Sequence, residues 1–129
     1  METIKKISKA IVWTSYILQG IIVLMFLMGA FMNLSQNEEA IKGAVEMGYP
    51  KEAMLYLGIV QLIAILLYAI PRTVIIGAIL ITGWLGGAVA THVIHKDPMF
   101  NIVFPVIFGI IVWGSIWLRN EKLKLLVLN

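Results

Sequence analysis

The apolar part of this 129-residue chain holds few polar side chains that could take part in chemistry. Gln19 and Gln61 each lie near the middle of an uncharged stretch, and Trp84 lies near the middle of a third. A polar group in an apolar medium needs a hydrogen-bond partner, so we expect these three side chains to meet. Together they could bind the polar group of a lipid-like or quinone-like molecule, or they could simply hold helices together.

A second set of polar residues lies at the ends of these stretches. We expect its members to approach one another at an outer rim: Glu52, His92, His95, Asp97 and Asn101. Histidine beside carboxylates can bind a divalent metal or relay protons. The spacing here is generic, however, and both histidines lie near the end of one stretch. We therefore predict no metal site and expect the histidines to bond to water.

Other kinds of chemistry lack the residues they need. The chain has no cysteine, which excludes disulfides, thiolate metal sites and dithiol redox chemistry. It also has no glycine-rich phosphate loop, no nucleophile elbow and no pair of carboxylates inside an uncharged stretch. We therefore expect no catalytic residues and no cofactor ligand set, and we favour a non-enzymatic protein.

Uncharged stretches must position all of these side chains. There are four, at residues 10–32, 53–70, 73–91 and 98–118. Hydrophobic residues make up 60% of the chain and charged residues 13%, far from the averages of soluble domains. A helix rises about 1.5 Å per residue, so roughly 20 apolar residues cross a hydrocarbon core of about 30 Å. The sequence predicts an all-α integral membrane protein with a single membrane domain over residues 1–129.

The connections predict how the four helices are arranged. Residues 71–72 and 92–97 are short connections, which favour antiparallel neighbours. The first connection is longer, and Ser35 and Glu38 have the spacing of a capping box, which predicts a short interfacial helix at about 36–47. We therefore expect an antiparallel up-down bundle of four transmembrane helices.

Small residues mark the third stretch as a packing surface. Gly83, Gly86, Gly87 and Ala90 are three or four residues apart, which lets two helix backbones approach closely in lipid. We expect them to pack inside the bundle, with a homodimer contact or a ligand groove as alternatives.

The charges predict the orientation in the membrane. On one side of the four stretches lie Lys5, Lys6, Lys9, Arg72, Arg119, Lys122 and Lys124. The other side has only Lys42, Lys51 and Lys96. Because Lys and Arg are enriched on the cytoplasmic side, both termini should be cytoplasmic. The net charge of +3 therefore reflects topology and does not indicate a nucleic-acid partner.

Several segments are similar to those of one family of small bacterial membrane proteins. They are Gly48-Tyr49-Pro50, residues 57–62 (LGIVQL), Ile70-Pro71-Arg72-Thr73 and residues 82–92 (TGWLGGAVATH). On these segments the chain resembles the DoxX-like family over about residues 26–118, most specifically at 85–92 followed by Asp97-Pro98. The resemblance implies four transmembrane helices in the bacterial cytoplasmic (inner) membrane. The family takes its name from a subunit associated with thiosulfate:quinone oxidoreduction.

The chain departs from the family pattern at the expected pocket. Gln61 stands where such sequences often have a glutamate, and Trp84 stands where they often have a tyrosine. Loss of an ionisable group argues against a proton-coupled or redox role. His92 is retained, so it joins Gln19, Gln61 and Trp84 as a candidate ligand-binding residue.

The function expected from these observations is binding or assembly. The protein would bind a hydrophobic lipid-like or quinone-like molecule, or a partner membrane protein, within the lipid bilayer. One alternative is a membrane subunit of a quinone-linked oxidoreductase. Another is a small transporter that works as a homo-oligomer.

Overall fold

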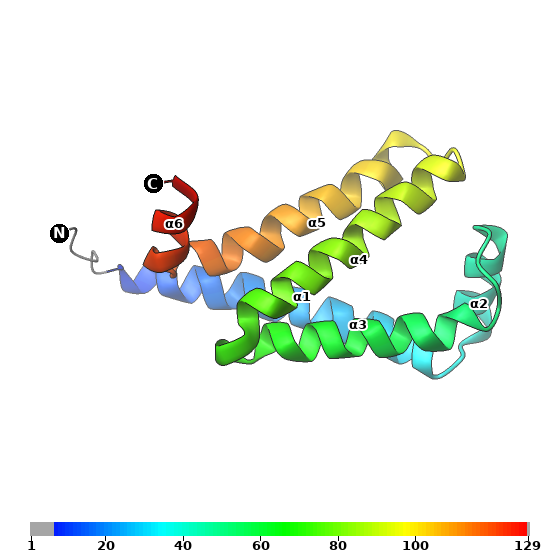
Figure 1. Cartoon of the computed structure of the whole chain (residues 1–129), viewed down its shortest axis with the longest axis horizontal. Helices are drawn as coiled ribbons and strands as arrows, with labels where there is room; N and C mark the ends of the chain where they lie inside the picture. Colours follow the sequence, from blue (N-terminus) through cyan, green and yellow to red (C-terminus); the bar gives the residue numbers. More distant parts are fainter. Residues whose placement is uncertain (1–6, 129) are drawn as a thin grey trace.

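The computed structural model describes residues 7–128, and every regular element in that range is helical (Figure 1). The elements are α1 (Lys9–Leu34), α2 (Glu38–Glu46), α3 (Ala53–Ala69), the 3₁₀ turn η1 (Pro71–Thr73), α4 (Val74–Ile94), α5 (Met99–Trp117) and α6 (Glu121–Leu128). The four uncharged stretches thus form helices whose ends lie a few residues from the predicted ones. Helix α6 was not predicted.

Three segments of the described chain are long and apolar enough to cross a membrane. They are α1, the segment Pro71–Ile94 and α5. Helix α3 is equally apolar but has 17 residues, which corresponds to roughly 26 Å of helix and is near the lower limit for a span. The protein is therefore an all-helical membrane protein, as the composition predicted.

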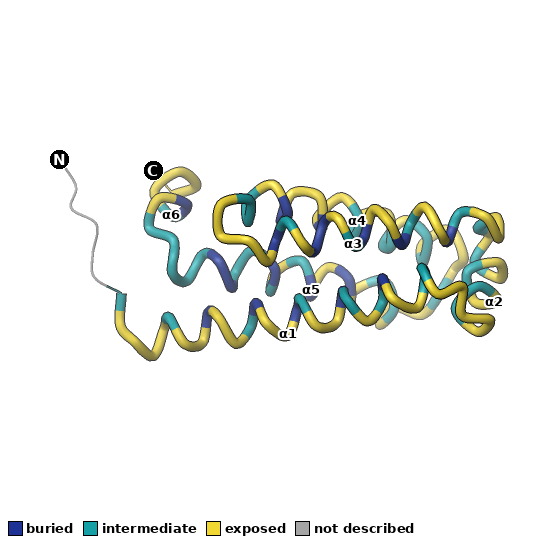
Figure 2. Tube along the Cα trace, turned by 90° about the horizontal axis from the view of Figure 1, so that it is seen from below, coloured by how far each residue is buried: buried dark blue, intermediate teal, exposed yellow. Residues whose placement is uncertain are grey.

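The long helices pack in two pairs that share one core. Helix α1 packs against α3 and α5, and α4 packs against the same two helices. Buried residues recur at intervals along the long helices (Figure 2), and the largest fully buried hydrophobic ones are Ile22, Ile65, Tyr68, Ile81, Val112 and Ile116. In Figure 1 the α4–α5 pair diverges from the α1–α3 pair toward the end that carries α2. At that end the Tyr49 hydroxyl and Thr91 Oγ1 are 2.5 Å apart and hydrogen bonded.

Helix α2 forms where an interfacial helix was predicted, but its N-cap differs. Asn37 caps it, and the Asn37 side chain accepts a hydrogen bond from the backbone N–H of Ala40 at 3.1 Å. The predicted capping box at Ser35 is wrong because α1 runs on to Leu34 and Ser35 caps its C-terminus. Gly48 ends α2 with φ at +99°, a conformation that glycine adopts without strain.

The glycines of α4 do not pack as predicted. A Cβ added at Gly83, Gly86 or Gly87 would contact nothing within 4 Å beyond its chain neighbours and the adjacent backbone of α4, and Ala90 is exposed. The face of α4 that packs lies nearer its N-terminus, where Gly77 and Ile81 meet α3 and the core. The spacing of the small residues identified a smooth surface on α4, but it did not show which way that surface faces.

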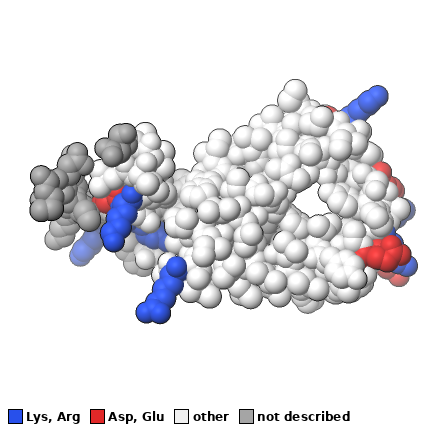
Figure 3. Space-filling view, in the orientation of Figure 1, with Lys and Arg blue, Asp and Glu red and all other residues white. Residues whose placement is uncertain are grey.

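Charged side chains gather at the two ends of the molecule. Figure 3 shows Lys, Arg, Asp and Glu at both ends and a white, uncharged middle on the face drawn. Lys9, Arg72, Arg119, Lys122 and Lys124 lie in the segments at the α6 end, whereas Lys5 and Lys6 lie outside the described residues. An uncharged middle between charged ends is the distribution that a bilayer requires.

Candidate functional site

The structure does not bring Gln19 and Gln61 together. Gln19 Nε2 donates to the backbone carbonyl of Tyr68 at 3.0 Å, and Gln61 Oε1 accepts from Asn33 Nδ2 at 3.0 Å. Helices α1 and α3 run antiparallel, and Gln61 lies against Gly29. That position is about 10 residues beyond Gln19 on α1, or roughly 15 Å along its axis. The prediction of one cluster assumed that helix midpoints coincide, whereas α1 and α3 are offset.

Gln61 and Trp84, by contrast, line one cavity. Its volume is about 180 Å³. Its other lining side chains are apolar, and half of them are aromatic: Met25, Phe26, Leu85, Phe104, Pro105 and Phe108. Trp84 also borders a second cavity of about 240 Å³ between α4 and the start of α3, lined in addition by Tyr49, Leu57, Gly83, Gly87 and Ala88. Figure 3 shows an opening between the two helix pairs toward the α2 end of the molecule.

Gln61 and Trp84, which both line this first cavity, each have a hydrogen-bond donor with no protein acceptor in the described chain. Within residues 7–128, neither Gln61 Nε2 nor the Trp84 indole N–H donates a hydrogen bond, because the one bond of Gln61 uses its oxygen. Neither atom is a fully buried donor without a partner, so both can be reached by a ligand. Donors in an apolar cavity at membrane depth are costly unless an acceptor meets them. The arrangement suits a molecule with a carbonyl or similar acceptor.

The outer rim is built around one carboxylate. His92 Nδ1 and Asp97 Oδ2 are 2.5 Å apart, and His95 Nδ1 and Asp97 Oδ1 are 2.6 Å apart. Lys96 adopts φ of +61° in the turn between the helices. In the described chain, neither Glu52 nor Asn101 forms a side-chain hydrogen bond with His92, His95 or Asp97. Within the same residues, no three His, Asp or Glu side chains come close enough together to hold a metal ion. His92 therefore belongs to the rim, and it does not line the cavity of Gln61 and Trp84.

Replacing Asp97 by asparagine should loosen this turn near neutral pH and have no effect in strong acid. The hydrogen bonds from His92 and His95 hold the pKa of Asp97 below its ordinary value of 3.8. A carboxyl whose pKa is depressed by folding stabilises the fold above its unfolded pKa, and this contribution is lost as the pH falls through the folded pKa. Wild type and D97N should therefore differ near neutral pH, and the difference should vanish as the pH falls through the lowered pKa of Asp97.

Hydrogen exchange of the amides at 92–99, corrected for intrinsic rates, measures this effect. Glu52→Gln removes an exposed carboxylate from the same end and should leave exchange unchanged. A difference between wild type and D97N that persisted to about pH 2 would contradict the assignment.

A polar network that the sequence analysis missed joins α1, α3 and α5 at the α6 end. The Tyr68 hydroxyl donates to the carbonyl of Val112 at 2.7 Å and bonds with Ser115 Oγ at 2.6 Å. Ser15 Oγ donates to the carbonyl of Ser115, and Arg119 donates to both Ser15 and Gln19. The sequence did carry a signal, because Ser15 with Gln19 and Ser115 with Arg119 are pairs four residues apart, the spacing of neighbours on a helix face, although Arg119 lies in the turn after α5.

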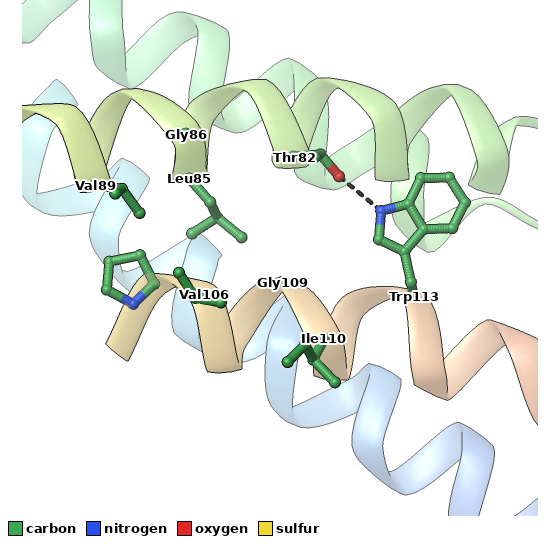
Figure 4. A pocket seen from close by; sticks show the side chains of 9 residues that line it. Thr82, Leu85, Gly86, Val89, Val106, Gly109, Ile110 and Trp113 are labelled. Carbon is green, nitrogen blue, oxygen red and sulfur yellow. Dashed lines mark hydrogen bonds between the residues drawn. The ribbon is translucent and has the colours of Figure 1, made fainter. Parts of the chain in front are cut away.

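A groove of about 500 Å³ lies between α4 and α5 (Figure 4). Its lining side chains are almost all apolar: Leu85, Val89, Pro105, Val106 and Ile110, with Gly86 and Gly109 between them. The Trp113 indole N–H closes one end by donating to Thr82 Oγ1 at 2.7 Å. Both polar groups are thereby satisfied, so this groove presents only hydrocarbon to an occupant.

Comparison with known proteins agrees with the earlier resemblance. The sequence model of the DoxX-like family matches residues 17–115, which include Gln19, Gln61, Trp84 and His92. No curated protein and no solved structure matches the chain. A match over this much of the chain, on a set of apolar helices, shows the family, and the chain belongs to the DoxX-like family of membrane proteins.

Proposed function

We propose that this membrane protein binds a lipid-like or quinone-like molecule through a hydrogen-bond acceptor that meets Gln61 and Trp84. The observation that carries the proposal is that Gln61 and Trp84, whose Nε2 and Nε1 donate to no acceptor within residues 7–128, line one otherwise apolar cavity. A bound carbonyl would accept the hydrogen bond that each of these donors lacks.

The shape of the site supports a ring or a short chain segment as the group that enters. A cavity of about 180 Å³ is smaller than the roughly 300 to 1,000 Å³ of sites that enclose a whole drug-sized ligand. The rest of the molecule would lie in the surrounding lipid. Phe26 and Phe104 both contact Phe108, with ring centroids 5.3 and 6.3 Å apart, and these rings give a planar group aromatic walls.

We also propose that α1, α3, α4 and α5 cross the bacterial inner membrane as an up-down bundle with both termini in the cytoplasm. The supporting observations are the short connections and the excess of Lys and Arg at the α6 end. In this orientation the Asp97 rim faces outward.

Binding of decylubiquinone tests the proposal. Protein purified in mild detergent is titrated with this quinone, its thermal stabilisation is measured, and co-purified amphiphiles are identified by mass spectrometry. Gln61→Leu and Trp84→Phe should each weaken binding about fivefold, because each removes one donor worth on the order of 1 kcal/mol. Trp113→Phe is the matched control, since the Trp113 indole bonds to Thr82 outside this cavity.

The controls also decide what would refute the proposal. Wild-type protein that carries no co-purified amphiphile and gains no stability from decylubiquinone would overturn it. Equal losses in Trp84→Phe and Trp113→Phe would show that quinone interacts with the protein without using this site.

A further inference from the structure

Arg119 carries a positive charge that no carboxylate of the described chain neutralises. It follows α5 directly, is half-buried, and reaches across to α1. Its protein partners are neutral oxygens, Ser15 Oγ, Gln19 Oε1 and the Ser115 carbonyl. Within residues 7–128 the ion pairs within 4.0 Å are those of Asp97 and Glu121, and neither involves Arg119. A buried or half-buried cation with only neutral partners attracts an anion.

The guanidinium keeps one edge free to bind that anion. Arginine has five N–H donors, and the three protein bonds use two on Nη1 and one on Nη2. The donors left without an acceptor in the described chain are Nε–H and one hydrogen of Nη2, and Nε and Nη2 share one edge of the planar group. Such an edge matches two oxygens of a phosphate. The Tyr16 ring lies 4.2 Å from the guanidinium carbon and holds its plane in place.

Two cavities meet at Arg119, and they differ in character. One, of about 410 Å³, is the more polar of the two and reaches Asn120 and Lys122. Glu121 also lines it, but Lys124 Nζ binds the Glu121 carboxylate at 3.2 Å. The cavity thus contains two cations against one carboxylate that is already paired.

The second cavity, of about 390 Å³, is mostly apolar and follows α1 away from the charged end. Gly20, Val23 and Leu24 line it together with Ala69, while Tyr16, Pro71 and Arg119 line both cavities. A space lined by cations beside an apolar one, at the charged end of a membrane protein, fits a headgroup and the start of an acyl chain. A free phosphate would use only the first.

We infer that Arg119 binds the phosphate of an anionic phospholipid in the leaflet at the α6 end. The phosphate takes the free edge of the guanidinium, Lys122 lies beside the headgroup, and an acyl chain follows α1 past Gly20 and Val23. The site is separate from the cavity of Gln61 and Trp84, and it does not depend on the function proposed for that cavity.

Lipid retention measured by native mass spectrometry tests the inference. Full-length protein is released from nanodiscs that contain equal amounts of phosphatidylglycerol and phosphatidylcholine. Wild type should retain phosphatidylglycerol in preference. Arg119→Gln should lower that preference about tenfold, and Arg119→Lys should lower it severalfold, because lysine keeps the charge but loses the two-donor edge. Arg72→Gln is the matched control, since Arg72 lies at the same end but lines neither cavity.

Each of the following results would overturn the inference. Equal retention of both lipids by wild type would show no anionic-lipid site, and equal losses in Arg119→Gln and Arg72→Gln would show diffuse attraction to the basic end. Displacement of phosphatidylglycerol by millimolar inorganic phosphate would identify a free anion as the occupant. If Arg119→Gln does not fold, Arg119→Lys decides, because an unchanged preference there would exclude the two-donor contact.

Discussion

Replacing Gly77 by alanine is expected to lower the free energy of unfolding by about 3 kcal/mol, the upper part of the range for overpacked cores. A Cβ at this position would lie 2.2 Å from the backbone nitrogen of Tyr68 and 2.4 Å from its Cα. These are backbone atoms of α3, so relief requires the two helices to move apart. The free energy is measured by titrating the protein from dodecylmaltoside into sodium dodecyl sulfate.

Gly86→Ala is the matched control for this prediction. It makes the same change in the same helix, but a Cβ at Gly86 would meet nothing within 4 Å. We expect a change of at most about 0.5 kcal/mol there. Equal stability of the two variants would show that α3 and α4 do not approach as closely as described.

Replacing Tyr68 by alanine should destabilise the protein by about 3 to 5 kcal/mol, the range for large aromatic side chains removed from a core. Tyr68 is fully buried, and its hydroxyl joins α3 to α5 through Val112 and Ser115. Tyr68→Phe keeps the ring and loses only the two hydrogen bonds, so it should cost about 1 kcal/mol, as is usual for hydrogen bonds between membrane helices.

Tyr56→Ala provides the control for the tyrosine series. Tyr56 lies on the same helix but is 67% exposed, so its removal should change the unfolding free energy little in detergent titrations. If Tyr68→Ala were no more destabilising than Tyr56→Ala, the core described around α3 would be wrong.

The helices were predictable because the bilayer imposes a simple rule on the sequence. Uncharged runs of sufficient length form helices, and the charged residues fall between them. The turn at Pro71 is equally direct, since so short a connection allows few arrangements. These features depend on local sequence and on the solvent, and neither requires knowledge of how helices contact one another.

The composition of the site was harder to predict because it depends on axial offset between helices. Gln19 and Gln61 both lie near the centre of an apolar run, yet α1 has 26 residues and α3 has 17. Their midpoints therefore do not mark a common depth. Trp84 falls opposite Gln61 because α4 packs against α3 at the observed register. Nothing in the composition of the individual helices specifies that register.

Helix rotation was the second quantity hidden from sequence. Gly83, Gly86 and Gly87 form a smooth strip, but hydrophobic residues surround α4 on all sides and give no amphipathic signal to orient it. Arg119 was counted only as a charge that sets topology. Its contacts with Ser15 and Gln19 depend on the packing of α1 against α5, which links residues about 100 positions apart.

The hydrogen bond between Tyr49 and Thr91 has a mechanical consequence. Among residues 7–128, this hydrogen bond connects the two diverging helix pairs at the α2 end. The opposite end is closed by the bonds of Tyr68, Ser15 and Arg119. The two ends therefore differ in stiffness, and thermal fluctuation should separate the pairs at one end while the other acts as a fixed pivot. A guest molecule would thus enter sideways from the bilayer, without crossing an aqueous entrance.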